Sequence, residues 1–465
     1  MALGASAALG ADSDLAKKAA ARRLPDWPNL EEVIIVTKCH LDVGYTHTVP
    51  ELVKLYRTSY MDKALALFDS DRTMPPDLRA RWTLPAWLTD AILNGPYSPE
   101  RRAKIEDAVR QRRLMWHALP FTSETEASDP EELVRMFSYG SNLSRKFGFD
   151  LPRYAKQTDV PEHAWVMPTL LAHAGVKFLH LGSNPCSKPK SVVEKIPTLC
   201  WWEGPDGSRI LLGYSPKYGW MGNGSVTPPK GWRHKTWLAY YMRGDNAGPM
   251  SRKEVDNILR KARQQLPGIK VRFGDPDEFA DLYNNQWNTN FPLWIPGSWS
   301  ASLRVYPVAH GADEEQSVFT PAWEIRQPAV AAFADNKKII HVEQVEHVEN
   351  LNDLHVLHGQ KNNGEVGSPL PAAANGLVLS RKGVRVTAFC PNPDGEGTVL
   401  RVWEQAGKGG DITVTLPQGM QAATAQPVNL HGEIAGEPIA VKNGKFTFAL
   451  GAWAPKSFVL DVKTP

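Results

Sequence analysis

The sequence has little cysteine, little net charge and no long apolar run, and each shortage removes a class of protein. Its four cysteines are scattered (Cys39, Cys186, Cys200, Cys390) and match neither a disulfide framework nor a zinc motif of paired cysteines. The 53 basic and 50 acidic side chains leave a formal net charge of +3, with no long basic block, so nucleic acid is not expected as a partner. No apolar run approaches the roughly 18 residues of a spanning helix, so no membrane is expected either.

Other chemical signatures are also missing. Glycine-rich phosphate loops, nucleophile elbows and Cys-x-x-Cys pairs are absent from the positions where they would act, which removes nucleotide and thiol chemistry. What remains is a chain of 465 residues, 42% hydrophobic, long enough for two or three globular domains. Its alanine-rich start, ALGASAALGA, is typical of the end of a secretory signal or of a disordered tail. The end of a secretory signal predicts a periplasmic or secreted protein, whereas a disordered tail is also compatible with the cytoplasm.

The central part of the chain alternates predicted strands and helices, which is typical of a parallel α/β sheet. Strands are predicted at 33–37, 81–88, 114–121, 154–160, 175–181, 209–214 and 270–273. Helices are predicted at 50–69, 98–113, 167–174, 253–265 and 277–284. We therefore expect an α/β catalytic domain over residues 31–285, barrel-like and with parallel strands.

The end of the chain has a different pattern. From residue 377 apolar and polar residues alternate between Gly and Asn turns, which predicts an antiparallel β-sandwich over 377–465. Residues 286–358 are expected to form a short helical or irregular connection, and the Gly, Pro and Asn of 359–376 a linker. Residues 1–30 are expected to be a tail or the remnant of a signal.

Polar side chains gather where the predicted strands end. His40 and Asp42 follow the β-branched run Val33–Thr37, and in extended backbone both point to the same side. His117 follows the third predicted strand, and Asp159 ends the fourth. Because the carboxyl ends of parallel strands share one edge of a sheet, these groups would face one cleft. His-x-Asp is half of a metal site, although a strand-end cap or turn has the same pattern.

Four segments of the chain read HLDVGYT, WHALPFTSETEASDPEEL, AKQTDVPEHAWVMPTLLAHAGVKFLHLGSNP and LCWWEGPDGSRILLGY. In this order and spacing they resemble glycoside hydrolase family 38, the α-mannosidase family. The resemblance covers roughly residues 31–283, and VLRVWEQAG is more weakly similar to the terminal β-domain of the family. Only about 90 residues lie where the family carries a helical bundle and a large central β-domain, so the chain resembles a shortened branch.

The resemblance implies one divalent metal, most simply zinc, and retaining α-glycosidase chemistry on an oligo- or polysaccharide. His40 and Asp42 match the His-x-Asp zinc ligands of the family, and Asp159 matches the carboxylate that is both ligand and nucleophile. From position alone, Asp159 could instead be a helix N-cap or a turn residue. The nearest match to the fourth ligand is His310, with a group of histidines at 341–358 as the alternative.

Further roles stay open at this point. Glu126 or Glu124 could be the general acid, or their loop could cap the next helix. His117 could donate to substrate or be a buried histidine satisfied by the backbone. Aromatic faces near strand ends suit sugar rings, although several of the 16 tryptophans must be core; the candidates are Trp116, Trp202 and Tyr218.

Two rival functions remain. In a metal-dependent polysaccharide lyase, Tyr45, His47 or His117 would transfer the proton while the metal neutralises a uronate, and the unsaturated product would absorb ultraviolet light. An inactive sugar-binding protein would show affinity without turnover.

Overall fold

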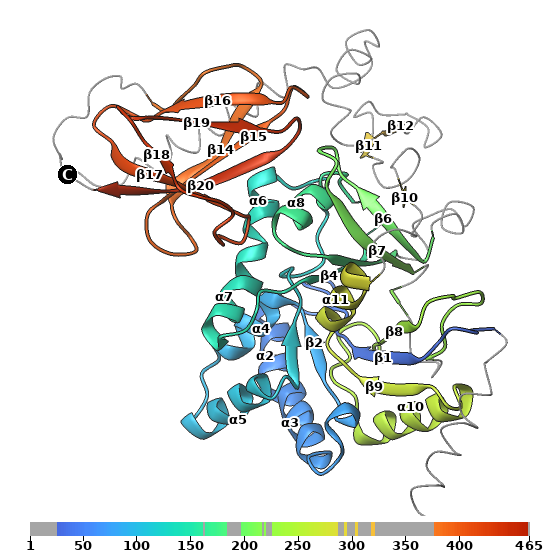
Figure 1. Ribbon diagram of the computed structural model, residues 1–465. Coiled ribbons are helices and arrows are strands. Elements are labelled where there is room, and N and C mark those ends of the chain that lie inside the picture. The colour runs from blue at the N-terminus through green and yellow to red at the C-terminus, as the bar shows by residue number, and fades with distance from the viewer. Residues whose placement is uncertain are drawn as a thin grey trace, which may run out of the picture.

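The computed structural model of the protein describes residues 26–160, 163–183, 197–215, 218–219, 226–286, 293–294, 303–305, 318–320 and 376–463. Strands alternate with single helices or groups of helices up to residue 183 and again over residues 236–286, and only strands are described between these two parts (Figure 1). The strands are β1 (Glu32–Thr37), β2 (Trp82–Leu84), β3 (Leu114–Trp116), β4 (Tyr154–Asp159), β5 (Phe178–Ser183), β6 (Leu199–Glu203), β7 (Arg209–Ser215), β8 (Thr236–Tyr241) and β9 (Lys270–Phe273). The helices are α2 (Val49–Leu55), the π-helical turn η1 (Tyr56–Tyr60), α3 (Met61–Ser70), η2 (Pro76–Leu78), α4 (Ala86–Leu93), α5 (Pro99–Arg110), α6 (Pro130–Arg135), α7 (Phe137–Phe147), α8 (Met167–His173), α10 (Arg252–Gln265) and α11 (Pro276–Gln286).

Strand β1 is the centre of the first sheet. Its last five residues are buried, and it pairs in parallel with β8 on one side and β9 on the other. A β-branched run buried on both faces is the pattern that predicted this strand. Past its end, an isolated parallel bridge joins His40 to Asp245. The end of β1 and the turn after β8 therefore lie side by side.

The remaining strands of this part form two further sheets. Strands β2 and β3 pair in parallel, and a five-stranded sheet has the order β10-β6-β7-β5-β4, where β10 is Leu293–Trp294. Strand β6 runs antiparallel to β7, which corrects the expectation of parallel strands only. The cause is local, because the residues from Gly204 to Gly207 form a tight Gly-Pro-Asp-Gly turn closed by a 3.0 Å backbone hydrogen bond. The described strands thus show mixed α/β architecture with parallel sheets, without showing a closed barrel.

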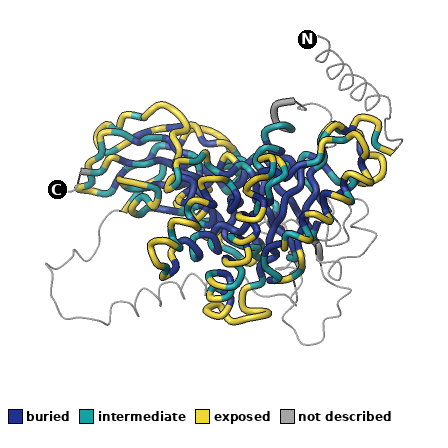
Figure 2. Tube along the Cα trace, turned by 90° about the horizontal axis from the view of Figure 1, so that it is seen from below, coloured by how far each residue is buried: buried dark blue, intermediate teal, exposed yellow. Residues whose placement is uncertain are grey.

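Helices cover these sheets and close two apolar cores. One core joins β1 and β8 to helices α2 to α5 and α10, and the other joins β4 to β7 with α6 to α8. Seen from below, buried residues run through the middle of the molecule and exposed residues through its outer turns (Figure 2). None of the helices in the described ranges is long and apolar enough to cross a membrane.

The C-terminal part confirms the predicted antiparallel strands. It has one sheet ordered β13-β16-β19 and one ordered β14-β15-β20-β17-β18. The strands are β13 (Val378–Leu379), β14 (Val384–Pro391), β15 (Thr398–Glu404), β16 (Gly410–Thr415), β17 (Gln421–Val428), β18 (Ile439–Ala440), β19 (Lys445–Leu450) and β20 (Pro455–Lys463). A separate apolar core lies between them.

This β-rich part packs against α6 and α7 (Figure 1). Trp403 belongs to the second apolar core of the α/β part, and the buried Arg401 pairs with Glu131 on α6. On α7, Arg145 pairs with Asp394 at 3.1 Å. The expected boundaries at residues 285, 358 and 376 fall on or beside ranges outside the described residues, and these boundaries, like the one at residue 30, stay predictions. Short strands β11 (Leu303–Val305) and β12 (Val318–Thr320) pair antiparallel within that connection.

Candidate functional site

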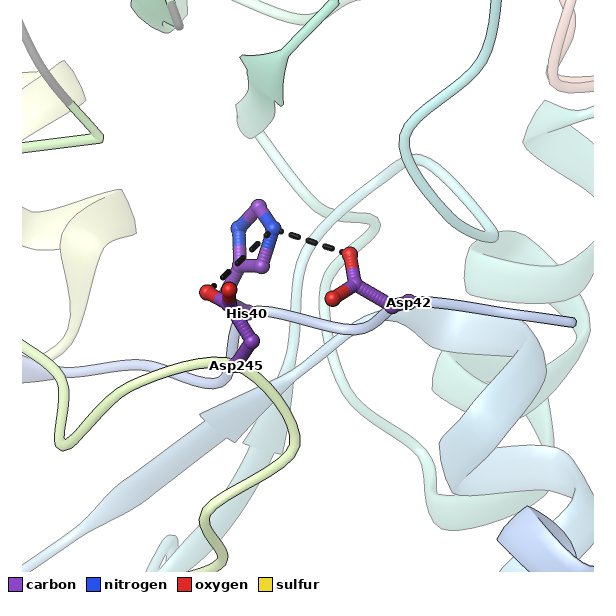
Figure 3. A group of neighbouring side chains, drawn as sticks. All are labelled: His40, Asp42 and Asp245. Carbon is purple, nitrogen blue, oxygen red and sulfur yellow. Dashed lines mark ion pairs between the residues drawn. The ribbon is translucent and has the colours of Figure 1, made fainter. Parts of the chain in front are cut away.

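Three carboxylates surround one imidazole nitrogen at the ends of β1, β4 and β8. From Nε2 of His40 the distances are 3.0 Å to Asp42 Oδ1, 3.7 Å to Asp159 Oδ2 and 3.8 Å to Asp245 Oδ1. Ligand atoms of His40, Asp42 and Asp245 all lie within 4.8 Å of one another (Figure 3). The structure thus brings together the three residues predicted from the sequence, and it adds Asp245, which sequence reasoning missed.

Strand pairing explains why these residues meet. Because β1 and β8 are parallel neighbours, their carboxyl ends lie at the same edge, and the His40–Asp245 bridge continues their pairing. Asp159 is the last residue of β4 and has a φ of 86°. A non-glycine residue rarely adopts this left-handed region, and such residues concentrate at functional sites.

The four side chains differ in exposure. His40 and Asp42 are 2% and 10% exposed, whereas Asp159 and Asp245 are 36% and 49% exposed. His40 and Asp42, the inner pair, are therefore held by the surrounding protein. Asp159 and Asp245, the outer pair, are accessible to a ligand.

Tyr218 holds one of these outer carboxylates. Its hydroxyl donates a hydrogen bond to Oδ1 of Asp159, and its ring stacks on His40 with centroids 4.5 Å apart and planes 5° apart. Burial and the hydrogen bond to Asp159 both raise the pKa of the Tyr218 hydroxyl, so this group stays a proton donor. Tyr218 was expected to bind sugar directly; its observed contact is with the predicted nucleophile.

Two buried lysines lie beneath the carboxylates. The ammonium of Lys156 donates to Thr158 Oγ1 at 2.7 Å, and this hydroxyl lies 3.5 Å from Nδ1 of His40. Burial lowers the pKa of Lys156 to about 8, against the pull of Asp159 and Asp42. Burial also lowers the pKa of Lys38 well below its usual value, and the charge of Lys156 lowers it further. Because Thr158 contacts Nδ1, the other imidazole nitrogen is the one turned toward the carboxylates.

Two of the predicted sugar-binding residues belong to the core instead. Trp116 is 6% exposed, and its indole N–H donates to Ser144 Oγ at 3.2 Å. Trp202 is fully buried in β6. A buried indole has no free face for a sugar ring, so neither residue fits the role expected for it.

The predicted acid–base residues make no ion pair with His40 among the described residues. His117 is buried, its Nδ1 accepts a 3.3 Å hydrogen bond from the Leu119 N–H, and burial lowers its pKa well below the usual value. It matches the alternative of a buried histidine only in part, because the backbone satisfies Nδ1 while the buried Nε2 has no hydrogen-bond partner among the described residues. Glu124 is exposed and Glu126 half-buried, and neither contacts His40 within the described ranges.

Two candidates remain to be placed. Tyr45 is 87% exposed in the loop after β1, where a ligand can reach it. His310 lies outside the described residues, so its role as a fourth ligand stays a prediction.

The donor set suits a divalent ion. One imidazole nitrogen with carboxylate oxygens is a set that zinc accepts, whereas calcium prefers oxygen ligands alone. In addition, three carboxylates that crowd one point repel each other unless a cation lies between them. The residues present therefore fit a bound metal.

A family profile and two solved structures are similar to this chain. The profile of the "Glycosyl hydrolases family 38 N-terminal domain" matches residues 31–296, more than half of the chain. No curated protein matches the sequence. Among solved structures, an alpha-mannosidase from Enterococcus faecalis V583 is similar, with 15% identity over 93% of this chain and 56% of that chain, and a TM-score of 0.46. A second Enterococcus faecalis protein, of glycosyl hydrolase family 38, has 15% identity over 94% of this chain and 54% of that chain, and a TM-score of 0.40.

The chain spans little more than half the length of these two proteins. The profile match covers β1 to β9, and hence all four residues of the group around His40. On this match, the chain belongs to glycosyl hydrolase family 38.

Proposed function

We propose that the protein is a divalent-metal-dependent retaining α-glycosidase, with α-mannosidase-like action on an oligo- or polysaccharide. The observation that carries this proposal is the convergence of three carboxylates on His40, within the part of the chain that matches the family. A retaining glycosidase needs two accessible carboxyl groups at the scissile bond, and the outer pair here is accessible.

The buried pair would form the fixed part of the metal site. His40 and Asp42 would hold the ion, and the carboxylate of Asp159 would add a third ligand, with Asp245 beside the ion rather than bound to it. A bound divalent ion, which we propose to be zinc, would supply a template that orients hydroxyl groups of the sugar.

The exposed pair would carry out the bond changes. Asp159 attacks the anomeric carbon, the glycosidic C–O bond breaks, and Asp245 gives its proton to the leaving oxygen. Asp245 then takes a proton from water, and the water oxygen attacks the same carbon and releases Asp159. Tyr218 keeps one oxygen of Asp159 hydrogen-bonded and so orients the other. Asp245 replaces Glu126 as our candidate for the acid because it contacts the group and is half-exposed.

The lyase alternative has less support. Three carboxylates around His40 would repel the uronate that a lyase must bind. His117, one of its candidate proton carriers, is buried and bonded to the backbone. We therefore keep the hydrolase as the proposed function.

The decisive experiment measures the activity of a variant on two substrates whose leaving groups differ. Because a general acid matters most when the leaving group is poor, Asp245→Asn should lose far more activity on an α-linked mannobiose than on an activated aryl α-mannoside. Elemental analysis of the wild type should find one divalent metal, and chelation should abolish activity on both substrates. Asp69→Asn, an exposed carboxylate on α3, is the control and should behave as wild type.

Three outcomes would contradict the proposal. They are equal activity losses of Asp245→Asn on the two substrates, full activity after complete chelation, and a product that absorbs in the ultraviolet as an unsaturated uronate does.

A further inference from the structure

Asn246, beside the site, is 3% exposed and joins two loops. Its backbone N–H donates to His40 O at 3.0 Å. Its side-chain Nδ2 donates to Asp42 O at 2.9 Å and to Thr46 Oγ1 at 2.7 Å, and its Oδ1 accepts from Asp42 N at 3.3 Å. One side chain thus ties the loop after β1 to the turn that carries Asp245.

Two tyrosines fix Asn246 from the opposite side. The hydroxyl of Tyr56 donates to Asn246 Oδ1 at 3.3 Å, and that of Tyr60 donates to Asn246 O at 2.5 Å. Both belong to the π-helical turn η1, inserted between α2 and α3. Such π-helical insertions occur frequently at functional sites. Asn246 is therefore clamped between this turn and the loop after β1.

The backbone restricts which residues fit here. Asn246 has a φ of 47°, a left-handed conformation that glycine and asparagine adopt more readily than most residues. Glycine would keep this conformation but lose every side-chain bond. By contrast, residues 43–50 are all exposed, so the loop depends on such bonds for its position.

We infer that Asn246 is a positioning residue that holds residues 41–48 in place and so sets the separation of Asp42 from Asp245. The inference rests on the proposed function only in expecting a metal bound by His40 and Asp42, with Asp245 beside it. The fixed loop geometry itself is a property of the metal-free protein. Groups that orient metal ligands in this way typically contribute about 10- to 100-fold to metal affinity.

The test replaces Asn246 by glycine, which removes the amide without straining the backbone. Asn443→Gly is the matched control, because Asn443 is also left-handed (φ 52°) but lies exposed in a turn between β18 and β19. Thr46→Val removes only one of the bonds and serves as a milder variant. Two quantities are measured on the full chain: the dissociation constant of Co²⁺, from its visible absorption in metal buffers, and amide hydrogen exchange in the metal-free protein.

We expect Asn246→Gly to weaken Co²⁺ binding by about 10- to 100-fold and to speed exchange in residues 41–48. Exchange in β1 and β8 should stay as in the wild type. Thr46→Val should shift both quantities in the same direction by less, and Asn443→Gly should shift neither.

Unchanged exchange and Co²⁺ affinity in Asn246→Gly would overturn the inference. So would faster exchange throughout β1 and β8, since Asn246 would then be a general structural residue. If the wild type itself binds no Co²⁺, the metal part of the proposed function fails, and exchange in residues 41–48 alone decides the role of Asn246.

Discussion

Replacing Lys156 by methionine should remove a pH-dependent part of the free energy of unfolding. Lys156 is buried in β4, and burial lowers its pKa from 10.5 to about 8. Between these values the unfolded chain binds the proton while the folded chain releases it. Stability therefore rises with pH across this window and falls as the pH drops through about 8.

The magnitude follows from the two pKa values. Well below pH 8 the buried ammonium destabilises the fold by about 3 kcal/mol relative to high pH, at about 1.4 kcal/mol per pKa unit. Going from pH 7.5 to 9.5 recovers about 2 kcal/mol of this. A methionine has a similar shape and no titrating group, so the variant lacks this gain.

Urea unfolding at pH 7.5 and pH 9.5, with chelator present, measures the effect. The free energy of unfolding of the wild type, minus that of Lys156→Met, should rise by about 2 kcal/mol between the two conditions. Lys442→Met, at an exposed position, controls for the loss of a surface charge. A difference that stays constant with pH would mean that Lys156 titrates normally, and the account of the charge beneath the site would be wrong.

Two further predictions concern the carboxylate that we propose as nucleophile. Tyr218→Phe removes the hydrogen bond that orients Asp159, so kcat should fall about 10- to 100-fold; an unchanged kcat would contradict this role. Asp159→Asn should lower turnover by several orders of magnitude while most of the metal stays bound, and near-normal turnover would exclude Asp159 as nucleophile.

The strands that the sequence predicts well are those with a clear local pattern. Strand β1 is a run of β-branched residues. Strand β9, KVRF, matches its predicted range of 270–273, because polar and apolar residues alternate in it. Helix α5 is also well predicted, since Ser98 followed by proline is a helix start, and Ser98 does cap it. Strand β8, TWLAYY, was not predicted, although its threonine and aromatic residues favour a strand.

Position along a strand can be predicted more readily than the environment of a side chain. Trp116 and Trp202 do lie at the ends of β3 and β6, as expected, yet both are buried. The reason is that helices and strands distant in sequence cover them. For Trp116 the partners are Ser144 and Phe149, which follow it by about 30 residues. The same limit applies to His117, whose burial turns a candidate proton donor into a neutral core residue.

The two halves of the site differ in how the sequence encodes them. His40 and Asp42 stand two apart after one strand, so a local pattern is enough to bring them together. Asp245 reaches His40 only through the register of β1 on β8, in which Val33 pairs with Trp237 and Thr37 with Tyr241. A slip of one residue would turn Asp245 away, because neighbouring side chains point in opposite directions. The bonds of Asn246 to His40 and Asp42 hold this register at the point where strand pairing ends, so the residue next to Asp245 also determines whether Asp245 reaches the site.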